Sequence, residues 1–205
     1  EDIWNNKSDT VIFEFTPLYE ERFDKNLWAQ FNLPDDTNAP QYGPLEELWS
    51  DKDGILTDRS YFFQSPNIPG LTLPNWFTID LGADYKFGRM LVNNVHHGDR
   101  NYHYWRYAMG TPQTFEIWGT NNPSIDWNNW TLLGSFECVK PSGAPIGVIE
   151  DIDYEQIIKG DEYDFPPQGE DDYYRYIRFK TNTTFGGNAN VYLLELTFWG
   201  QKRQD

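Results

Sequence analysis

The stretch from 94 to 110, N-V-H-H-G-D-R-N-Y-H-Y-W-R-Y-A-M-G, holds the densest chemistry of the 205-residue chain. It contains all three histidines together with two arginines and four aromatic residues. Flat ring faces accept the C–H groups of a sugar, and arginine and histidine side chains donate to its hydroxyls. These residue types predict a carbohydrate site. The alternative, in which Tyr102, Tyr104 and Trp105 only pack over the end of a domain, stays open.

Metal chemistry at the histidines is disfavoured. His96 and His97 are adjacent, and adjacent residues of a strand point to opposite faces, so the two cannot easily share one ion. Cys138 is the only cysteine, which excludes an internal disulfide and a multi-cysteine zinc site. We therefore expect Cys138 to be a free thiol.

A second cluster surrounds Gly54 in the stretch 48–60, L-W-S-D-K-D-G-I-L-T-D-R-S. Oxygen ligands grouped about a sharp glycine turn suit a hard cation such as calcium. The alternative is an exposed turn stabilised by its own Asp side chains. The match to an EF-hand loop is poor, because no glutamate stands at the twelfth position.

Glu195 lies in the C-terminal stretch E-L-T-F-W-G, and in the alternating pattern it shares a face with Val191, Leu193 and Trp199. A carboxylate among apolar neighbours needs a partner, either a cation or several hydrogen-bond donors.

The composition limits the possible partners. The chain has 32 acidic and 16 basic residues, giving a formal net charge of -16. Such a charge repels phosphate backbones and anionic lipid headgroups, so neither nucleic acid nor direct membrane contact is expected. No apolar run approaches the roughly 20 residues that span a bilayer. Aromatic residues make up 18% of the chain, more than a core of this size requires, so some of them should be exposed.

Period-two alternation of apolar and polar residues predicts strands through most of the chain. The predicted strands are 10–18, a lead-in strand near 28–31, 75–82 ending at a turn on Gly82, 90–95, 114–119, 130–136, 174–181 and 195–200. A short helix is expected at 154–158, inside an acidic excursion from 140 to 172 whose role the sequence does not indicate. Short strands separated by turn signals, with almost no amphipathic helix, predict an all-β antiparallel sandwich in which 76–81 is central.

Five motifs then follow in a recognisable order: D-K-D-G-I-L-T, N-W-F-T-I-D-L-G, P-Q-T-F-E-I-W-G-T-N-N, Y-R-Y-I-R-F-K and L-L-E-L-T-F-W-G. Over about residues 45–200 this order resembles the discoidin, or coagulation-factor 5/8 type C, domain and the family 32 carbohydrate-binding modules. The resemblance implies a galactose-binding-domain-like jelly roll. It divides the chain into 1–44, the end of a preceding module with a lead-in segment, and 45–205, the discoidin-like domain.

Two further phrases, F-T-P-L-Y-E-E-R-F-D-K and F-E-C-V-K-P-S-G, resemble the uncharacterised C-terminal domains of Bacteroidetes surface lipoproteins from polysaccharide-utilisation loci. This resemblance implies an extracytoplasmic place at the cell surface or outer membrane, with the signal and lipid anchor outside the fragment. It also implies non-catalytic glycan capture and possible outer-membrane protein partners.

The resemblance to the carbohydrate modules assigns roles to groups of residues. A histidine, an arginine and an aromatic platform would come from the 96–107 loop, with further rings from the Gly-rich loop 183–190 and the strand at 76. The candidate ligand-binding residues are His96, His97, Arg100, Tyr104, Trp105, Arg106, Phe185 and Trp76. The net charge favours a neutral mono- or oligosaccharide over an acidic one.

The same resemblance implies one structural calcium ion, with Asp51, Asp53, Thr57 and Glu195 at the matching places. Lys52 or Arg59 is the alternative partner of Glu195. Two other functions compete with sugar binding: a protein-docking module, and a glycoside hydrolase. A hydrolase needs two carboxylates about 5 to 9.5 Å apart across a cleft, and the sequence marks no such pair.

Overall fold

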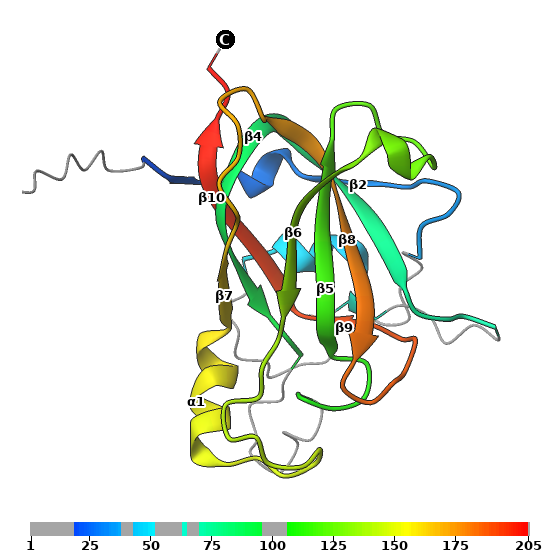
Figure 1. Cartoon of the computed structure of the whole chain (residues 1–205), viewed down its shortest axis with the longest axis vertical. Coiled ribbons are helices and arrows are strands. Elements are labelled where there is room, and N and C mark those ends of the chain that lie inside the picture. The colour runs from blue at the N-terminus through cyan, green and yellow to red at the C-terminus, as the bar shows by residue number, and fades with distance from the viewer. Residues whose placement is uncertain (1–18, 38–42, 52–62, 65–69, 96–105, 205) are drawn as a thin grey trace, which may run out of the picture.

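Strand β4 (Asn75–Asn93) bends near the top of Figure 1 and joins the two layers of a β-sandwich. Its first half pairs with β2 (Ala29–Phe31) and β8 (Tyr174–Thr184), and its second half pairs with β10 (Glu195–Lys202) and β7 (Asp161–Asp164). The computed structural model describes residues 19–37, 43–51, 63–64, 70–95 and 106–204.

Gly82 bends β4 and does not end it, so the predicted turn at this residue is wrong. The residue has a φ of 73°, and the register with β8 shifts between Asp80 and Tyr85. A Cβ at Gly82 would lie 2.4 Å from the carbonyl oxygen of Leu27, so only glycine fits the bend. The strands predicted at 75–82 and 90–95 are therefore two halves of one strand.

The remaining strands extend the sandwich at its edges. β5 (Pro112–Thr120) pairs with β8, β6 (Thr131–Glu137) pairs with β5, and β1 (Glu21–Arg22) pairs with β10. A separate short ladder joins β3 (Phe63–Gln64) to β9 (Tyr192–Leu193). Every one of these pairings in the described part of the chain is antiparallel, which confirms the predicted fold class.

The core forms where the alternating apolar residues of the two layers meet. Phe179 of β8 stacks on Phe77 of β4, with ring centroids 5.4 Å apart, and on Phe115 of β5 at 4.8 Å. From the other layer, Met90 and Phe198 are fully buried. The period-two pattern thus places one face of each strand inside, as predicted.

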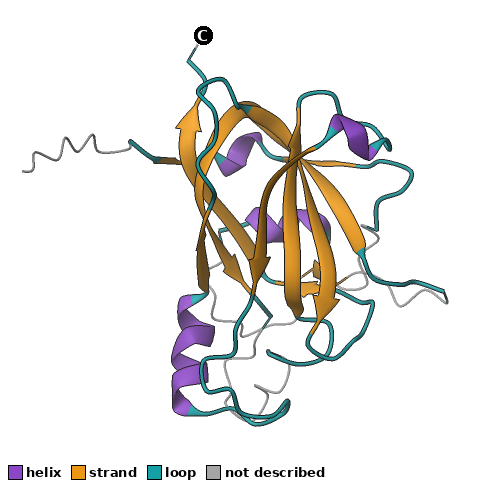
Figure 2. Ribbon diagram, in the orientation of Figure 1, coloured by secondary structure: helices purple, strands orange, loops and turns teal. Residues whose placement is uncertain are grey.

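Helices are few and short (Figure 2). Among the described residues they are η1 (Lys25–Leu27), η2 (Leu45–Trp49), η5 (Trp127–Asn129) and α1 (Asp151–Lys159), and α1 covers the helix predicted at 154–158. Glu150 and Asp153 form a capping box at the start of α1. No helix among the described residues is long and apolar enough to cross a membrane.

The described residues before 45 are built into the sandwich. Phe23 lies in the core and stacks on Tyr85 with ring centroids 3.9 Å apart. Strand β2 matches the predicted lead-in strand. The strand predicted at 10–18 lies outside the described residues.

Candidate functional site

Two loops meet at the lower end of the sandwich in Figure 1, one between 106 and 111 and one between 184 and 192. The backbone N–H of Phe185 donates to the carbonyl of Thr111 at 3.1 Å, and that of Gly186 donates to Met109 at 2.8 Å. A Cβ on Gly186 would lie 2.5 Å from the backbone of Met109. Glycine at 186 is what allows the two loops to lie in direct backbone contact.

The first of these loops carries backbone strain. Tyr107 has a φ of 54° and Met109 a φ of 47°, and both are in the left-handed region that residues with a Cβ rarely adopt. Each such residue costs on the order of 1 kcal/mol and persists only where its surroundings hold it. Strain of this kind concentrates at binding and active sites.

Asp161, the first residue of β7, is hydrogen-bonded to several segments at this end of the sandwich. Its carboxylate accepts from Arg106 Nη2 at 2.6 Å, Asn94 Nδ2 at 3.3 Å, Cys138 Sγ at 3.3 Å and Gln156 Nε2 at 3.1 Å. These donors come from the end of β4, the 106–111 loop, the end of β6 and helix α1. One buried carboxylate therefore fixes four segments at once.

Arg106 is part of this buried hydrogen-bond network and has no surface that a ligand could contact. Its side chain is 0% exposed, and it is paired with Asp161. Burial works against the charged guanidinium, yet the Asp161 carboxylate offsets burial and keeps the pKa of Arg106 above its usual value. This geometry does not support the prediction that Arg106 donates to a sugar, because the guanidinium has no exposed surface. Its pairing with Asp161 instead holds the 106–111 loop in place.

Cys138 is a free, buried thiol, as predicted. Burial and the neighbouring Asp161 carboxylate raise its pKa, so the thiolate is disfavoured. The residue contributes packing and a hydrogen bond to Asp161.

A cavity of about 340 Å³ lies elsewhere, beside Phe87 and Phe165, whereas the cavity at this end measures about 320 Å³. The second value falls in the range of small-ligand sites, about 300 to 1,000 Å³. Its wall combines rings, aliphatic groups and polar side chains, among them Tyr107, Gln113, Glu137, Lys140, Ile146 and Phe185. The rings of Phe185 and Tyr107 meet edge to face, 5.4 Å apart.

Some polar groups of the cavity are already hydrogen-bonded within the protein, and others are free to bind a ligand. Lys140 Nζ donates to the carbonyls of Ala144, at 2.9 Å, and Pro145, at 3.0 Å, so it holds its own loop. In the part of the chain that the structure describes, the side chains of Gln113 and Glu137 have no hydrogen-bond partner, and both are at least partly exposed. An amide and a carboxylate beside an aromatic wall are the groups that bind vicinal hydroxyls.

Of the three predicted ligand-binding residues that the structure describes, Trp76, Arg106 and Phe185, only Phe185 lines this cavity. Trp76 lies on the outer face of β4, where its ring meets Trp127 edge to face at 5.0 Å and lies over Arg178. His96, His97, Arg100, Tyr104 and Trp105 lie outside the described residues. Their predicted role stays a prediction.

Sequence reasoning missed Gln113, Glu137 and Asp161. Gln113 and Glu137 sit in strands whose neighbours showed only alternation, and Asp161 was one acid among many in the 140–172 excursion. The sequence offered one signal for Asp161: it directly follows Gly160, a glycine that caps the end of helix α1.

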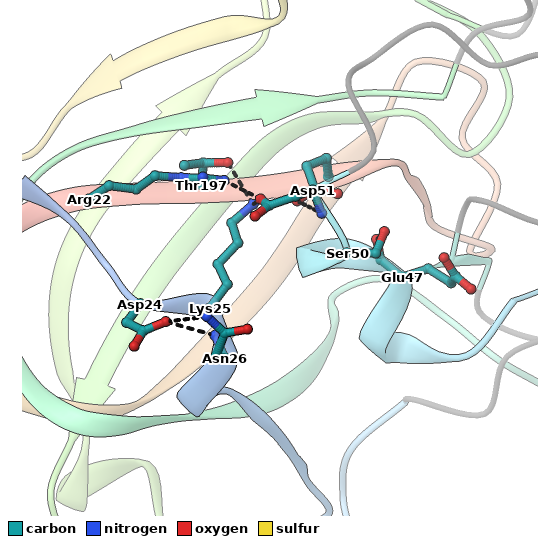
Figure 3. Close-up of polar contacts among 9 residues, drawn as sticks. Arg22, Asp24, Lys25, Asn26, Glu47, Ser50, Asp51 and Thr197 are labelled. Atoms are coloured by element: carbon teal, nitrogen blue, oxygen red, sulfur yellow. Dashed lines mark hydrogen bonds and ion pairs between the residues drawn. The ribbon is translucent and has the colours of Figure 1, made fainter.

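Of the predicted calcium residues, the structure describes Asp51 and Glu195, and neither lines this cavity. The ammonium of Lys25 contacts Asp51 (Figure 3), and it also contacts Glu195. Among the described residues, no three His, Cys, Asp or Glu side chains form a group that could hold a metal ion. The two described carboxylates already have a cation, so they do not by themselves fit a divalent ion. Asp53 and Thr57 lie outside the described residues, and calcium stays a prediction for the complete set of four.

A sequence model of the family DUF5000, described as a domain of unknown function, matches residues 52–200. The chain belongs to this family. A sequence comparison of this DUF5000 domain with curated proteins finds no match.

Solved structures relate this DUF5000 domain to known folds. The SusE-like protein BT2857 is 29% identical, with a TM-score of 0.80 over 99% of this chain and 75% of that chain. The C-terminal domain of a chitobiase from Bacteroides fragilis is 14% identical, with a TM-score of 0.58 over 90% of this chain and 100% of that chain. The family 32 carbohydrate-binding module of NanJ from C. perfringens, solved in complex with galactose, is 12% identical. Its TM-score is 0.53 over 88% of this chain and 99% of that chain.

These similarities confirm the resemblance inferred from the five motifs. The two lower identities establish the shared β-sandwich fold and nothing more specific. The higher identity to the SusE-like protein extends over almost the whole of this chain, including the segment before residue 52 that the family model does not match.

Proposed function

We propose that this chain is a non-catalytic carbohydrate-binding module whose ligand site is the cavity between the 106–111, 138–146 and 184–190 segments. The observation that carries the proposal is the juxtaposition of Phe185 with the partner-free side chains of Gln113 and Glu137 on one cavity. A ring, an amide and a carboxylate together supply the apolar contact and the hydrogen bonds that a sugar requires.

The comparisons support the same class of function. The NanJ module carries galactose on this fold, and modules of its family recur among the similar structures. The net charge of -16 favours a neutral monosaccharide or oligosaccharide. Because the cavity is small, we expect an affinity weaker than about 10 µM, equivalent to a binding free energy of about 7 kcal/mol or less.

The test is calorimetric titration of neutral sugars, beginning with galactose, against wild type, Phe185→Ala and Gln113→Ala. We expect each substitution to weaken binding about tenfold, the equivalent of about 1.4 kcal/mol. The matched control is Ile125→Ala, since Ile125 is exposed in the turn before η5 and does not line the cavity. Unchanged affinity in both folded variants would remove the site from this cavity.

A protein-docking function is the second candidate, favoured by exposed aliphatic groups beside the same cavity. Val139 is 65% exposed and Ile146 is 59% exposed, and Val148 and Ile152 are also exposed nearby in sequence. Exposed apolar side chains that cluster on a surface are typical of interaction sites. A Val148→Ser, Ile152→Ser variant, whose two residues are exposed and do not line the cavity, should lose capture of an outer-membrane partner while retaining sugar affinity if docking is the function.

The likeness to a SusE-like protein supports a place at the bacterial cell surface, where such a module would hold glycan near an uptake complex. Surface labelling of cells that produce the full-length protein, with a cytoplasmic protein as the negative control, tests this placement.

A further inference from the structure

Glu195 begins β10 with its carboxylate buried, the side chain being only 6% exposed. Burial raises the pKa of this carboxyl to about 7, although the Lys25 ammonium works to lower it. A buried carboxylate is stable only when it is paired. In the described part of the chain its Oε2 has no hydrogen-bond partner, so the pairing of Glu195 depends on Oε1.

Lys25 supplies that pairing from the opposite end of the sequence. It is the first residue of η1, and its Nζ contacts Glu195 Oε1, Thr197 Oγ1 at 2.8 Å and Asp51 Oδ1 at 3.0 Å. An ammonium has three N–H donors, and these three acceptors use all of them. The side chain is only 5% exposed, so these protein oxygens are the main compensation for its charge.

The position of the ammonium is fixed by local structure. The Asp24 side chain caps η1 by accepting from the backbone N–H of Asn26 at 3.0 Å (Figure 3). Arg22 Nη2 contacts the same Asp51 oxygen from the neighbouring strand β1. Burial acts to raise the pKa of Asp51, but the hydrogen bonds and charges of Lys25 and Arg22 together lower it.

We propose that the Lys25 ammonium is a built-in structural cation, which fills the place between Asp51 and Glu195 and makes the fold independent of a metal ion there. The cation joins three segments: the start of η1, the second residue after η2 (Asp51), and the first residue of β10. The resemblance to the carbohydrate modules implied calcium for this place, with Asp51 and Glu195 among its four ligands. The chain itself provides that charge from a position 170 residues before Glu195.

The test compares melting temperatures of wild type, Lys25→Met, Lys25→Met/Glu195→Met and Lys202→Met, each with excess chelator and with millimolar calcium. Wild type should be insensitive to both additions, although the cluster lines an open cavity of about 430 Å³ that solvent ions can enter. Lys25→Met should melt about 10 °C lower, since it leaves a buried carboxylate without its cation. Lys202 is an exposed lysine on the same strand β10, so its substitution is the matched control and should have little effect.

The double variant shows whether Lys25 stabilises the fold through its charge or only through the volume of its side chain. Removing both charges leaves no unpaired carboxylate, so we expect it to recover more than half of the loss. If Lys25→Met does not fold, recovery of folding in the double variant supports the proposal equally. A wild-type melting temperature that falls with chelator and returns with calcium would overturn it, as would a Lys25→Met variant as stable as Lys202→Met.

Discussion

Asp161 Oδ2 lies 2.6 Å from Nη2 of Arg106, and this contact pairs two charges in the interior below the candidate site. The carboxylate is 9% exposed and the guanidinium 0%. Within the described residues, Nε and Nη1 of Arg106 have no hydrogen-bond partner, so Asp161 is the main compensation for its charge.

We therefore expect Asp161→Ala to lower the free energy of unfolding by about 3 to 5 kcal/mol, the cost of an unpaired buried charge. The neighbouring Glu162→Ala is the matched control. Glu162 is 58% exposed and pairs with Arg89 at the surface, so its loss should cost less than about 1 kcal/mol. Urea denaturation measures both values. Equal, small losses in the two variants would show that the Arg106 pair does not support this end of the fold.

The close contact between the two site loops gives a second prediction. Gly186→Ala would place a Cβ 2.5 Å from the backbone of Met109 and should separate the loops, lowering both stability and sugar affinity. Gly187→Ala is the control, because nothing lies within 4 Å of its added Cβ and only its φ of 70° causes strain. That strain should cost about 1 kcal/mol. Thermal melts and sugar titration of the two variants distinguish steric contact from strain, and equal effects would contradict the proposed loop contact.

The core predicts a third result. Phe179 is fully buried between Phe77 and Phe115, so Phe179→Ala should lower the free energy of unfolding by about 3 to 5 kcal/mol. Leu132→Ala removes an exposed side chain from β6 and should change stability by less than about 0.5 kcal/mol. A small loss at Phe179, measured by the same denaturation, would mean that the two aromatic stacks are not the centre of the core.

Asp36 predicts how stability depends on pH. Burial raises its pKa to about 6 from 3.8, against the hydrogen bonds from Leu33 and Thr78 and the charge of Arg178. Between these two values the folded state holds a proton that the unfolded state has released, so the contribution of Asp36 to stability falls as pH rises from about 4 to 6. The contribution is at most about 3 kcal/mol, since one pKa unit corresponds to about 1.4 kcal/mol.

Asp36→Asn removes the titrating group and should flatten this part of the stability curve. The measurement is urea denaturation of wild type and variant at several pH values from 4 to 8. A wild-type curve that rises between pH 4 and 6, with the variant parallel to it, would contradict the raised pKa.

The sequence predicted the strands well because alternation depends on local chemistry alone. β5, β8 and β10 follow directly from residues such as Phe115, Ile177 and Phe198, whose burial needs no knowledge of the partner strand. Gly82 was misjudged because glycine serves a bend as readily as a turn. Only the packing of Leu27 against it decides between the two.

The candidate site was harder to predict, since its determinants are distant in sequence. Arg106 has the chemistry of a sugar-binding residue, and its burial depends on Asp161, which lies 55 residues later. Lys25 could not be matched to Glu195 from spacing, because nothing local marks an ion pair across the whole domain. Phe185 was found because a single ring in a Gly-rich loop is a local signal.

The central claim is that a sugar binds in the cavity between Phe185 and Gln113. The most direct measurement is a titration of the isotopically labelled protein with galactose, followed through its backbone amide resonances. We predict saturable shifts confined to Tyr107, Gln113, Glu137 and Phe185 and their neighbours, with none at η5. Shifts centred on Trp76 and Trp127, or no shifts with any neutral sugar, would contradict the account.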